Sequence, residues 1–381
     1  MEFGIFVQGY TPGPAGQDPS AEHAALMQEL DLCILADKHN WKFAWVTEHH
    51  GLAEYSHLSA SEVFLGYLAH ATERIHLGSG IFNLSPRACQ PARNAERVAM
   101  LDHLSNGRFE FGTGRGAGSH EVATFDILDV NSTRSEWDEA LPQILRMFRE
   151  RDYTFSGEHF SLSQPHDVLP KPLGPTHPPL WLACGSPSTY EKAGSLGLGV
   201  LGFNFSPISD LAPLVASYKD AVSRCTTPVG DYVNDNVMLT SSVICLEDRD
   251  RARAVAKRAN RGYLFSLVCL YHDTFPKPKG APVWPEPPIV MDDAMLDRAI
   301  EAGTVLCGTP DEVSEQLAQY DATGLDQLCF GMPHNFEGDE AAECIELFGR
   351  KVIPEFDKDP VVSTAHYRAS VAAGEGTKGA A

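Results

Sequence analysis

The sequence predicts an α/β protein that folds as a parallel (βα)8 TIM barrel with insertions. Short apolar runs typical of buried strands alternate with helical patterns along almost all of the 381 residues. Eight such runs occur, which is the number that a closed barrel of this kind requires. A doubly wound open sheet is the competing fold, but it normally has a Gly-rich turn after its first strand. Residues 8–13, QGYTPG, do not form that turn, so the barrel is favoured.

The strands are expected, in chain order, at Phe3–Val7, Phe43–Thr47, Ile75–Ser79, Arg108–Thr113, Leu180–Ala183, Gly199–Phe203, Met238–Ile244 and Gln327–Phe330. Helical patterns fill the intervals. In the first of them, Met27, Leu30 and Ile34 follow the spacing of one buried helix face. A late helix is expected to begin at residues 309–312, TPDE, because a capping hydroxyl, a first-turn proline and a following Glu occur together there.

The alternation is interrupted at three places, and residues 1–364 read as one domain. Residues 151–178 form a polar insertion, with a hairpin expected around 156–158. Residues 271–292 hold six prolines and one tryptophan without periodicity, and such a long segment in a compact domain is usually functional or disordered. Residues 365–381 are rich in Ala and Gly and are expected to form a flexible tail.

Composition limits the possible partners and compartments. With 30 Lys and Arg against 51 Asp and Glu, the formal net charge is −21, which disfavours binding to nucleic acid or an anionic membrane. The nine cysteines are widely spaced and include no C-x-x-C pair, so neither a disulfide framework nor a zinc site is indicated. No signal peptide opens the chain, and no apolar run reaches the ~20 residues that cross a bilayer. We therefore expect a cytoplasmic protein with reduced cysteines.

The barrel itself indicates where the site should lie, because barrel enzymes use the loops that leave the carboxyl ends of the strands. Four segments occupy such positions: residues 48–50 (EHH), 80–83 (GIFN), 114–118 (GRGAG) and 184–189 (CGSPST). We expect these four segments to meet at one rim of the barrel.

Two of these segments suggest an anion site. Ser186 or Ser188 is placed to cap the following helix, whose free N–H groups and dipole attract an anion. Arg115 lies between glycines that let a ligand approach the backbone, and its guanidinium suits a phosphate. The alternatives are serines that only cap the helix and an arginine held in a structural salt bridge. No G-x-x-x-x-G-K-[ST] loop occurs, so a nucleotide triphosphatase is not indicated.

The run Glu48-His49-His50 has two chemical interpretations. Adjacent strand residues point to opposite faces, so the two histidines are poorly placed to hold one metal ion together. No H-E-x-x-H spacing occurs either, and we expect no metal site. One histidine oriented by a neighbouring carboxylate suits acid–base chemistry at the rim, while the other is expected to pack beneath a loop.

Several stretches match one known family in the same order. They are residues 1–6 (MEFGIF), 45–50 (WVTEHH), 77–81 (LGSGI), 307–312 (CGTPDE) and 321–326 (DATGLD), and the most specific is 101–116 (LDHLSNGRFEFGTGRG). On these residues the chain resembles the bacterial luciferase-like, flavin-dependent monooxygenases, most closely the luciferase α-subunit type. The resemblance covers residues 1–356.

The resemblance implies an enzyme that uses reduced FMN and O₂. In that family a separate NAD(P)H-dependent flavin reductase supplies the reduced flavin. The flavin forms a C4a-hydroperoxyflavin with O₂ and oxygenates a small apolar or carbonyl substrate. The resemblance also implies a homodimer, or a heterodimer with a related subunit.

The same resemblance implies how the flavin is bound. The family's phosphate-binding arginine corresponds to Arg115, and its phosphate-binding turn corresponds to Gly185, Ser186 and Thr189. Ala117 would offer a backbone N–H to the phosphate. The resemblance further implies that a non-prolyl cis peptide at Gly80–Ile81 lies beneath the flavin ring.

For catalysis, the resemblance implies that His49 is the family's catalytic histidine, beside Glu48. Glu121 stands where the family often has an acidic residue near the flavin, and the family's mobile active-site lid falls within 271–292. Five aromatic residues are candidates for an apolar pocket: Tyr10, Phe82, Phe203, Phe205 and Trp284.

Two positions depart from luciferase. Gly114 stands where luciferase has a reactive cysteine, so neither thiol chemistry nor light emission is implied. Gly185 stands where luciferase has an acidic residue, so the turn lacks a negative charge that would repel phosphate. Two other functions stay open: an F420-dependent or other flavin-dependent hydride-transfer oxidoreductase of the same superfamily, and a non-catalytic flavin-binding protein.

Overall fold

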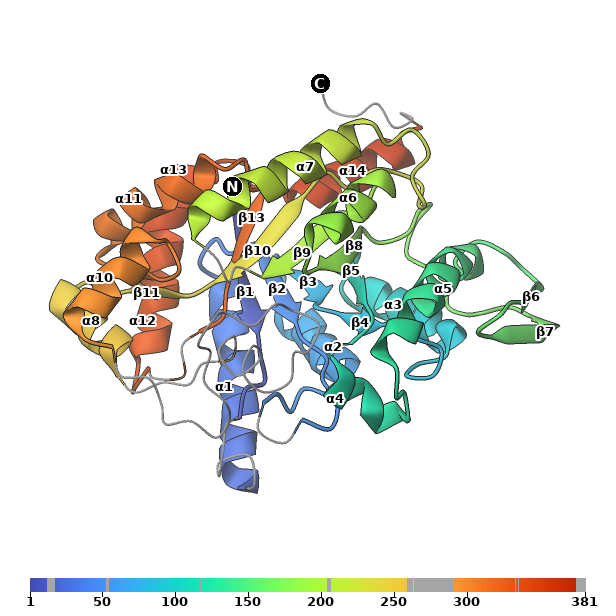
Figure 1. The fold of residues 1–381 in the computed structure, drawn as a ribbon, viewed down its shortest axis with the longest axis horizontal. Helices are drawn as coiled ribbons and strands as arrows, with labels where there is room; N and C mark the ends of the chain where they lie inside the picture. The colour runs from blue at the N-terminus through green and yellow to red at the C-terminus, as the bar shows by residue number, and fades with distance from the viewer. Residues whose placement is uncertain are drawn as a thin grey trace.

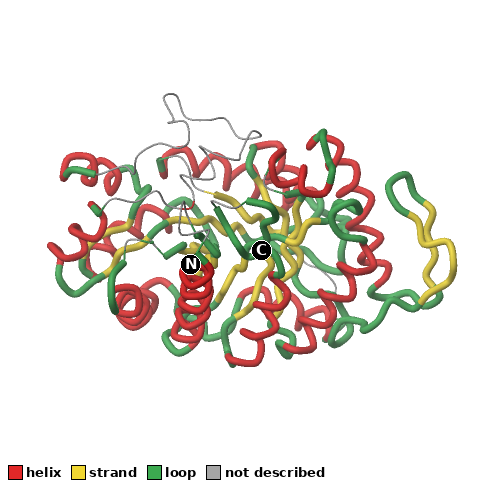
Figure 2. Tube along the Cα trace, turned by 90° about the horizontal axis from the view of Figure 1, so that it is seen from below, coloured by secondary structure: helices red, strands yellow, loops and turns green. Residues whose placement is uncertain are grey.

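The computed structural model describes residues 1–11, 18–52, 55–116, 118–203, 207–258, 263, 291–332, 334 and 336–374. Within these residues the barrel strands are β1 (Glu2–Val7), β2 (Phe43–Val46), β3 (His76–Ser79), β5 (Phe109–Gly114), β8 (Leu180–Cys184), β9 (Gly199–Phe203), β10 (Val237–Ser241) and β13 (Gln327–Phe330). They pair in parallel in the order β3-β2-β1-β13-β10-β9-β8-β5, and pairing of β3 with β5 closes the ring. The closed eight-stranded barrel is confirmed, and Figure 2 shows its strands in the middle of the molecule with helices around them.

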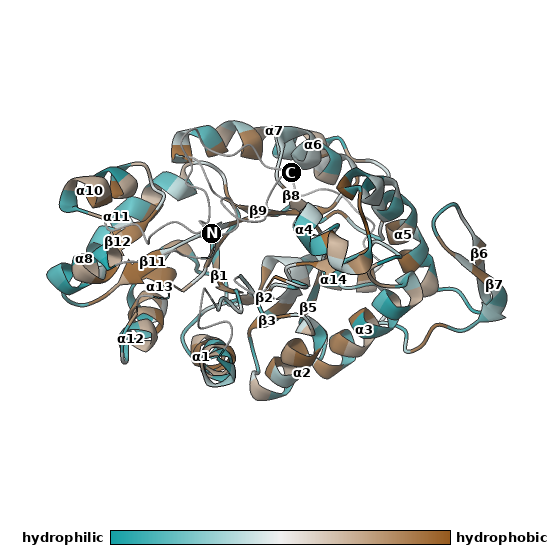
Figure 3. Cartoon of the chain, turned by 60° about the horizontal axis from the view of Figure 1, so that its bottom comes forward, coloured by the Kyte–Doolittle hydropathy of each residue, from teal (hydrophilic) through white to brown (hydrophobic). Residues whose placement is uncertain are grey.

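The helices of the described residues are α1 (Pro19–Asp37), α2 (Ser61–Ala71), α3 (Pro91–Leu104), α4 (Ser119–Val122), α5 (Thr133–Met147), α6 (Pro187–Ser195), α7 (Leu211–Ser223), α8 (Arg249–Lys257), α10 (Asp293–Glu301), α11 (Pro310–Asp321), α12 (Glu340–Leu347), α13 (Ile353–Phe356) and α14 (Ser363–Ala372). Many of the helices carry both polar and apolar residues, as Figure 3 shows. Helix α11 begins where the sequence predicts, because Thr309 N donates to Glu312 Oε2 at 2.9 Å in a capping box.

The strands divide the apolar side chains between two clusters. Ala44 and Val46 of β2 face outward and pack with the helices, whereas Phe43 and Trp45 face the barrel interior. The interior is narrow, so a large indole requires a small neighbour. Gly78 lies directly beneath the Trp45 ring, where a Cβ atom would overlap the indole. Side chains therefore fill the middle of the barrel, as in other eight-stranded barrels.

The insertion at 151–178 contains the predicted hairpin. Strands β6 (Tyr153–Ser156) and β7 (Ser161–His166) pair in antiparallel fashion and project away from the barrel (Figure 1). The short strand β4 (Phe82–Asn83) extends the edge of β5, and β11 (Val243–Cys245) pairs with β12 (Leu306–Gly308). The predicted lid at 271–292 lies outside the described residues except for its last two.

Part of the segment expected to form a flexible tail from residue 365 is helical, because helix α14 spans Ser363–Ala372. Alanine is the best helix former, and an Ala-rich segment folds readily once it has an anchor. Arg368 supplies that anchor: its Nη1 and Nη2 each lie 2.7 Å from an oxygen of the buried Asp102 carboxylate on α3. Arg368 also donates to the carbonyl of Gly107 at 3.2 Å.

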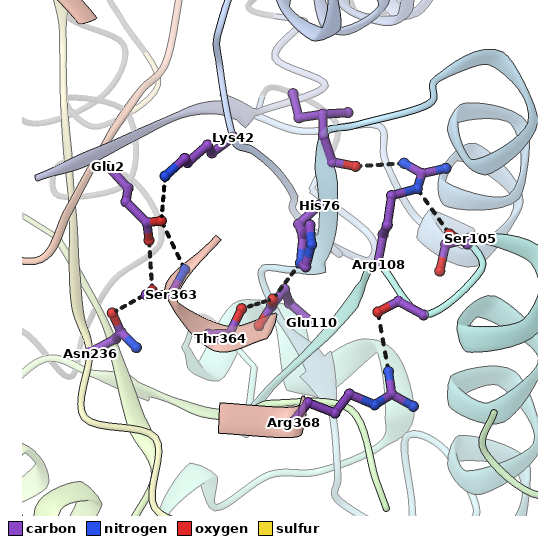
Figure 4. Close-up of polar contacts among 12 residues, drawn as sticks. Glu2, Lys42, His76, Ser105, Arg108, Glu110, Asn236, Ser363, Thr364 and Arg368 are labelled. Carbon is purple, nitrogen blue, oxygen red and sulfur yellow. Dashed lines mark hydrogen bonds and ion pairs between the residues drawn. The ribbon is translucent and has the colours of Figure 1, made fainter. Parts of the chain in front are cut away.

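Helix α14 closes the amino-terminal end of the barrel with polar contacts (Figure 4). Ser363 Oγ donates to Glu2 Oε2 at 2.7 Å, and Lys42 Nζ pairs with Glu2 Oε1 at 3.0 Å. Thr364 donates to Glu110, which is fully buried and also contacts His76 Nδ1 at 2.8 Å. We call this layer, formed by Glu2, Lys42, His76, Glu110, Ser363 and Thr364, the polar floor.

Replacing Arg368 by alanine is expected to lower the free energy of unfolding by about 3–5 kcal/mol, because it leaves the buried Asp102 carboxylate without its cation. Urea unfolding followed by circular dichroism measures the change. Arg146→Ala is the control, since Arg146 pairs with Glu150 on an exposed surface and its loss is expected to cost only about 0.3–0.5 kcal/mol. Equal losses in the two variants would show that α14 is not anchored by this pair.

Candidate active site

A cavity of about 260 Å³ opens at the carboxyl ends of the barrel strands. Eight of the nine predicted site residues line it: Glu48, His49, Gly80, Ile81, Arg115, Gly185, Ser186 and Thr189. The ninth, Ala117, lies outside the described residues. The four rim segments therefore meet at one place, as the barrel geometry predicts.

His49 follows β2 and is held on both sides of its ring. Nδ1 lies 2.6 Å from Glu121 Oε2, and Nε2 lies 2.6 Å from the hydroxyl oxygen of Tyr263. The Glu121 side chain is almost completely buried, so the carboxylate fixes the imidazole in a setting of low dielectric. A histidine held in this way by a carboxylate is suited to acid–base chemistry.

Glu48 precedes His49 in the chain, but its carboxylate has other partners. Its carboxylate accepts hydrogen bonds from Arg97 Nη1 at 2.9 Å and from Ser61 Oγ at 2.7 Å. Burial acts to raise the pKa of the Glu48 carboxyl, but hydrogen bonds from His50, Arg97 and Ser61 outweigh it and hold the pKa at about 2. Adjacent residues on an extended chain point in opposite directions, so Glu48 and His49 have separate surroundings.

The peptide bond between Gly80 and Ile81 is cis, as the resemblance implies. Gly114 lies against this segment, because a Cβ atom there would lie 2.6 Å from Ile81 Cγ1 and 2.8 Å from Ile81 Cδ1. The site at 114 therefore has no room for the cysteine side chain of luciferase while Ile81 keeps its position.

One end of the cavity is positively charged in a strongly acidic chain. Arg115 donates to Thr133 Oγ1 at 2.9 Å and to the carbonyl of Val130 at 3.4 Å, both neutral acceptors. Burial, followed by repulsion from Arg134, lowers the pKa of Arg115. Among the described residues neither guanidinium forms an ion pair with a carboxylate, whereas the nearby Lys192 pairs with Asp138.

The turn before α6 faces the same end of the cavity. Ser186 N donates to Thr189 Oγ1 at 3.1 Å, and the two hydroxyl groups of Ser186 and Ser188 lie 3.1 Å apart. The turn presents hydroxyl groups at the N-terminus of a nine-residue helix, beside the two arginines. Guanidinium groups and a helix N-terminus together favour a bound anion.

The rest of the wall is mostly apolar. Phe6, Leu182, Leu201, Phe203 and Met238 line it. Of the other predicted pocket aromatics, Tyr10 packs on Tyr263, Phe82 lies in the outer core, and Phe205 and Trp284 lie outside the described residues.

Thr240 on β10 adds a polar group to this wall. Its hydroxyl is buried and has no hydrogen-bond partner among the described residues. A buried hydroxyl without a partner costs free energy unless a ligand or water satisfies it.

Sequence reasoning missed Arg134, Lys192, Thr240 and Tyr263, all of which line the cavity. Arg134 and Lys192 stand on helices α5 and α6, where exposed cations are ordinary and carry no signal. In the described part of the chain no three His, Cys, Asp or Glu side chains are placed to hold a metal ion. No helix among those residues is long and apolar enough to cross a membrane.

A family model described as luciferase-like monooxygenase matches residues 1–327. The oxygenase component of the flavin-dependent trigonelline monooxygenase of Acinetobacter baylyi is 24% identical over 369 residues, which cover 95% of this chain and 97% of that protein.

Solved structures share the fold. The oxygenating constituent of 3,6-diketocamphane monooxygenase from the CAM plasmid of Pseudomonas putida, in complex with FMN, matches with a TM-score of 0.74 at 20% identity, covering 93% of this chain and 98% of that one. The coenzyme F420-dependent tetrahydromethanopterin reductase from Methanopyrus kandleri matches with a TM-score of 0.66 at 19% identity, covering 93% and 99%. At such identities these likenesses show the fold alone. The family match spans most of the chain, and the protein belongs to the luciferase-like monooxygenase family.

Proposed function

We propose that this protein is the oxygenase component of a two-component flavin-dependent monooxygenase, which uses reduced FMN and O₂ to oxygenate a small apolar or carbonyl substrate. A separate NAD(P)H-dependent flavin reductase supplies the reduced flavin. Family membership supports monooxygenase activity, and a relative that aligns over 95% of the chain is itself named as an oxygenase component. The apolar walls of the cavity support an apolar substrate.

The positively charged end of the cavity supports FMN as the bound flavin, because FMN carries a phosphate. Arg115 and Arg134 both line this end of the cavity, and neither forms an ion pair with a carboxylate among the described residues, so a bound dianion would have two cations to contact. A phosphate monoester carries close to two negative charges at neutral pH. It therefore suits a site that presents two guanidiniums. Gly185, Ser186 and Thr189 add the donors of the α6 turn.

The chain's own residues then perform three tasks around the flavin. Reduced FMN supplies the two electrons that activate O₂. Phe6, Leu201 and Phe203 form an apolar wall that would keep water away from the reacting groups. His49, oriented by Glu121, holds or takes up a proton, and the Thr240 hydroxyl offers a hydrogen bond to the bound ligand. The predicted role of Glu48 becomes structural in this proposal, since its carboxylate is occupied by Arg97.

We also propose that the protein forms a dimer through the outer face of α2 and α3. These neighbouring helices expose Val63, Tyr67, Met100 and Leu104, which are 48–69% accessible. A group of large apolar side chains on one surface is typical of a protein interface. Either an identical chain or a related subunit would cover it.

Oxygenated product distinguishes FMN-dependent oxygenation from F420 chemistry. Because reduced FMN consumes O₂ without any protein, the expected result is substrate-dependent product formation with reduced FMN and O₂ that is absent from a no-protein control. A panel of trigonelline, a long-chain aldehyde, limonene and a cyclic ketone tests the substrate. Hydride transfer with reduced F420 in the absence of O₂ would instead support the alternative oxidoreductase. Absence of both activities would support a non-catalytic flavin-binding protein.

Arg115→Ala is expected to weaken FMN binding by roughly 1.5–3 kcal/mol, because a charge-assisted hydrogen bond to the phosphate is lost. Fluorescence titration measures the affinity. Riboflavin, which lacks the phosphate, serves as the control ligand, and its affinity should not change in the variant. If FMN binding is unchanged as well, Arg115 does not hold the phosphate.

His49→Ala is expected to lower the rate of oxygenation by about 10²–10⁴, the usual contribution of a positioned acid–base group. The measurement is the initial rate of product formation in the coupled assay with a flavin reductase. His366→Ala is the matched control, because it also removes an imidazole paired with a carboxylate, but on an exposed surface of α14. Wild-type rates in His49→Ala would assign the acid–base role to another group.

A further inference from the structure

The imidazole of His49 has no free nitrogen to present to a ligand. Nδ1 lies 2.6 Å from Glu121 and Nε2 lies 2.6 Å from the Tyr263 hydroxyl, so both positions that exchange protons are occupied. Glu121 is only 2% exposed and is not among the described residues that line the cavity. Any proton that moves between His49 and the cavity through the existing contacts therefore passes through the Tyr263 oxygen.

Tyr263 is suited to stand between the histidine and a ligand. It lines the cavity, and it is only 2% exposed. Its ring stacks on Tyr55 with a centroid distance of 4.4 Å and meets the edge of Phe6 at 5.7 Å, so neighbouring rings fix its orientation. Burial raises the pKa of the Tyr263 phenol well above its ordinary value, so the resting group carries its proton.

We propose that Tyr263 is a catalytic residue, the proton relay between His49 and the ligand in the cavity, with Glu121 behind the imidazole. The inference rests on the proposed monooxygenase function for the identity of the ligand. It assigns the proton transfer to the ligand to a phenol rather than to the imidazole, although both side chains line the cavity.

The net result of the relay is the transfer of one proton from His49 to the ligand through Tyr263. When a ligand oxygen takes up a proton, the Tyr263 O–H bond breaks and a new O–H bond forms on the ligand. The Nε2–H bond of the His49 imidazolium then breaks and restores the phenol. The imidazole is left neutral, with its Nδ1–H donated to Glu121. The reverse sequence removes a proton from the ligand, and no electron is exchanged with the protein in either direction.

The first test is a double-mutant cycle on a single turnover. Wild type, Tyr263→Phe, His49→Ala and the double variant are loaded with reduced FMN and mixed with O₂, and the return of oxidised FMN is followed by absorbance. Each single variant is expected to slow this step by about 10²–10⁴. The double variant should be no slower than the slower single variant, because residues that act as one unit are not additive. The relay would be overturned if the rate losses of the two single variants multiplied in the double variant. It would also be overturned if Tyr263→Phe reacted at the wild-type rate.

Tyr153→Phe is the matched control. Tyr153 is also buried, and its hydroxyl donates one hydrogen bond to a side chain, Gln143 Oε1 at 2.9 Å, but it lies on the projecting hairpin. This variant is expected to reoxidise FMN at the wild-type rate. Affinity for FMN, measured by titration, should be equal in all of these variants, which separates proton transfer from a general loss of the site.

The second test does not depend on flavin chemistry. In histidine-selective ¹⁵N NMR of the ligand-free protein, the Nε2 resonance of His49 is expected to shift in Tyr263→Phe and to stay unchanged in Tyr153→Phe. An unchanged Nε2 resonance in Tyr263→Phe would show that the hydrogen bond does not exist and would overturn the proposal. If wild type forms no oxygenated product with reduced FMN and O₂, the proposed function fails, and the NMR result still decides whether Tyr263 and His49 are connected.

Discussion

The barrel interior is filled from one end, and this packing determines where a ligand has room. At the amino-terminal end the polar floor joins Glu2, Glu110 and the last helix through hydrogen bonds. Above it the indoles of Trp45 and Trp181 meet edge to face at 5.1 Å, each against a glycine of a neighbouring strand. At the other end, Gly114 of β5 and Gly80, which follows β3, have no side chain to fill the interior. The cavity lies at these two residues. A compact lower interior thus makes an open upper rim possible.

The strands were predictable because strands of a parallel barrel are buried on both faces and read as continuous apolar runs. The same regularity places His49, Arg115 and Ser186 at one rim, since it depends only on which residues follow a strand. Partners are harder to predict, because they come from loops whose path the sequence does not specify. Glu121 reaches His49 from 72 residues away through the short helix α4, whereas the adjacent Glu48 points elsewhere. Tyr263 belongs to no periodic pattern, so only its position in space identifies it.

Charge is distributed unevenly in this acidic protein. The net charge of −21 repels anions at long range, yet Arg115 and Arg134 face the cavity without a carboxylate partner among the described residues. Screening in salt reduces the long-range repulsion, because the Debye length at physiological ionic strength is about 8 Å. Arg115 is partly buried, so its charge is screened less than the charge of an exposed side chain. Its local attraction therefore acts against the general repulsion once an anion has reached the rim.

The position of α14 has a consequence for synthesis on the ribosome. Strand β1 pairs with β13, whose residues are 325 positions later, and the polar floor is closed by residues 363 and 364. At ~5–20 residues per second, the first strand waits many seconds for its second neighbour and longer still for the floor. During that time Glu2, Lys42 and Glu110 remain hydrated. Completion of the polar layer at this end of the barrel therefore awaits the last helix to be synthesised.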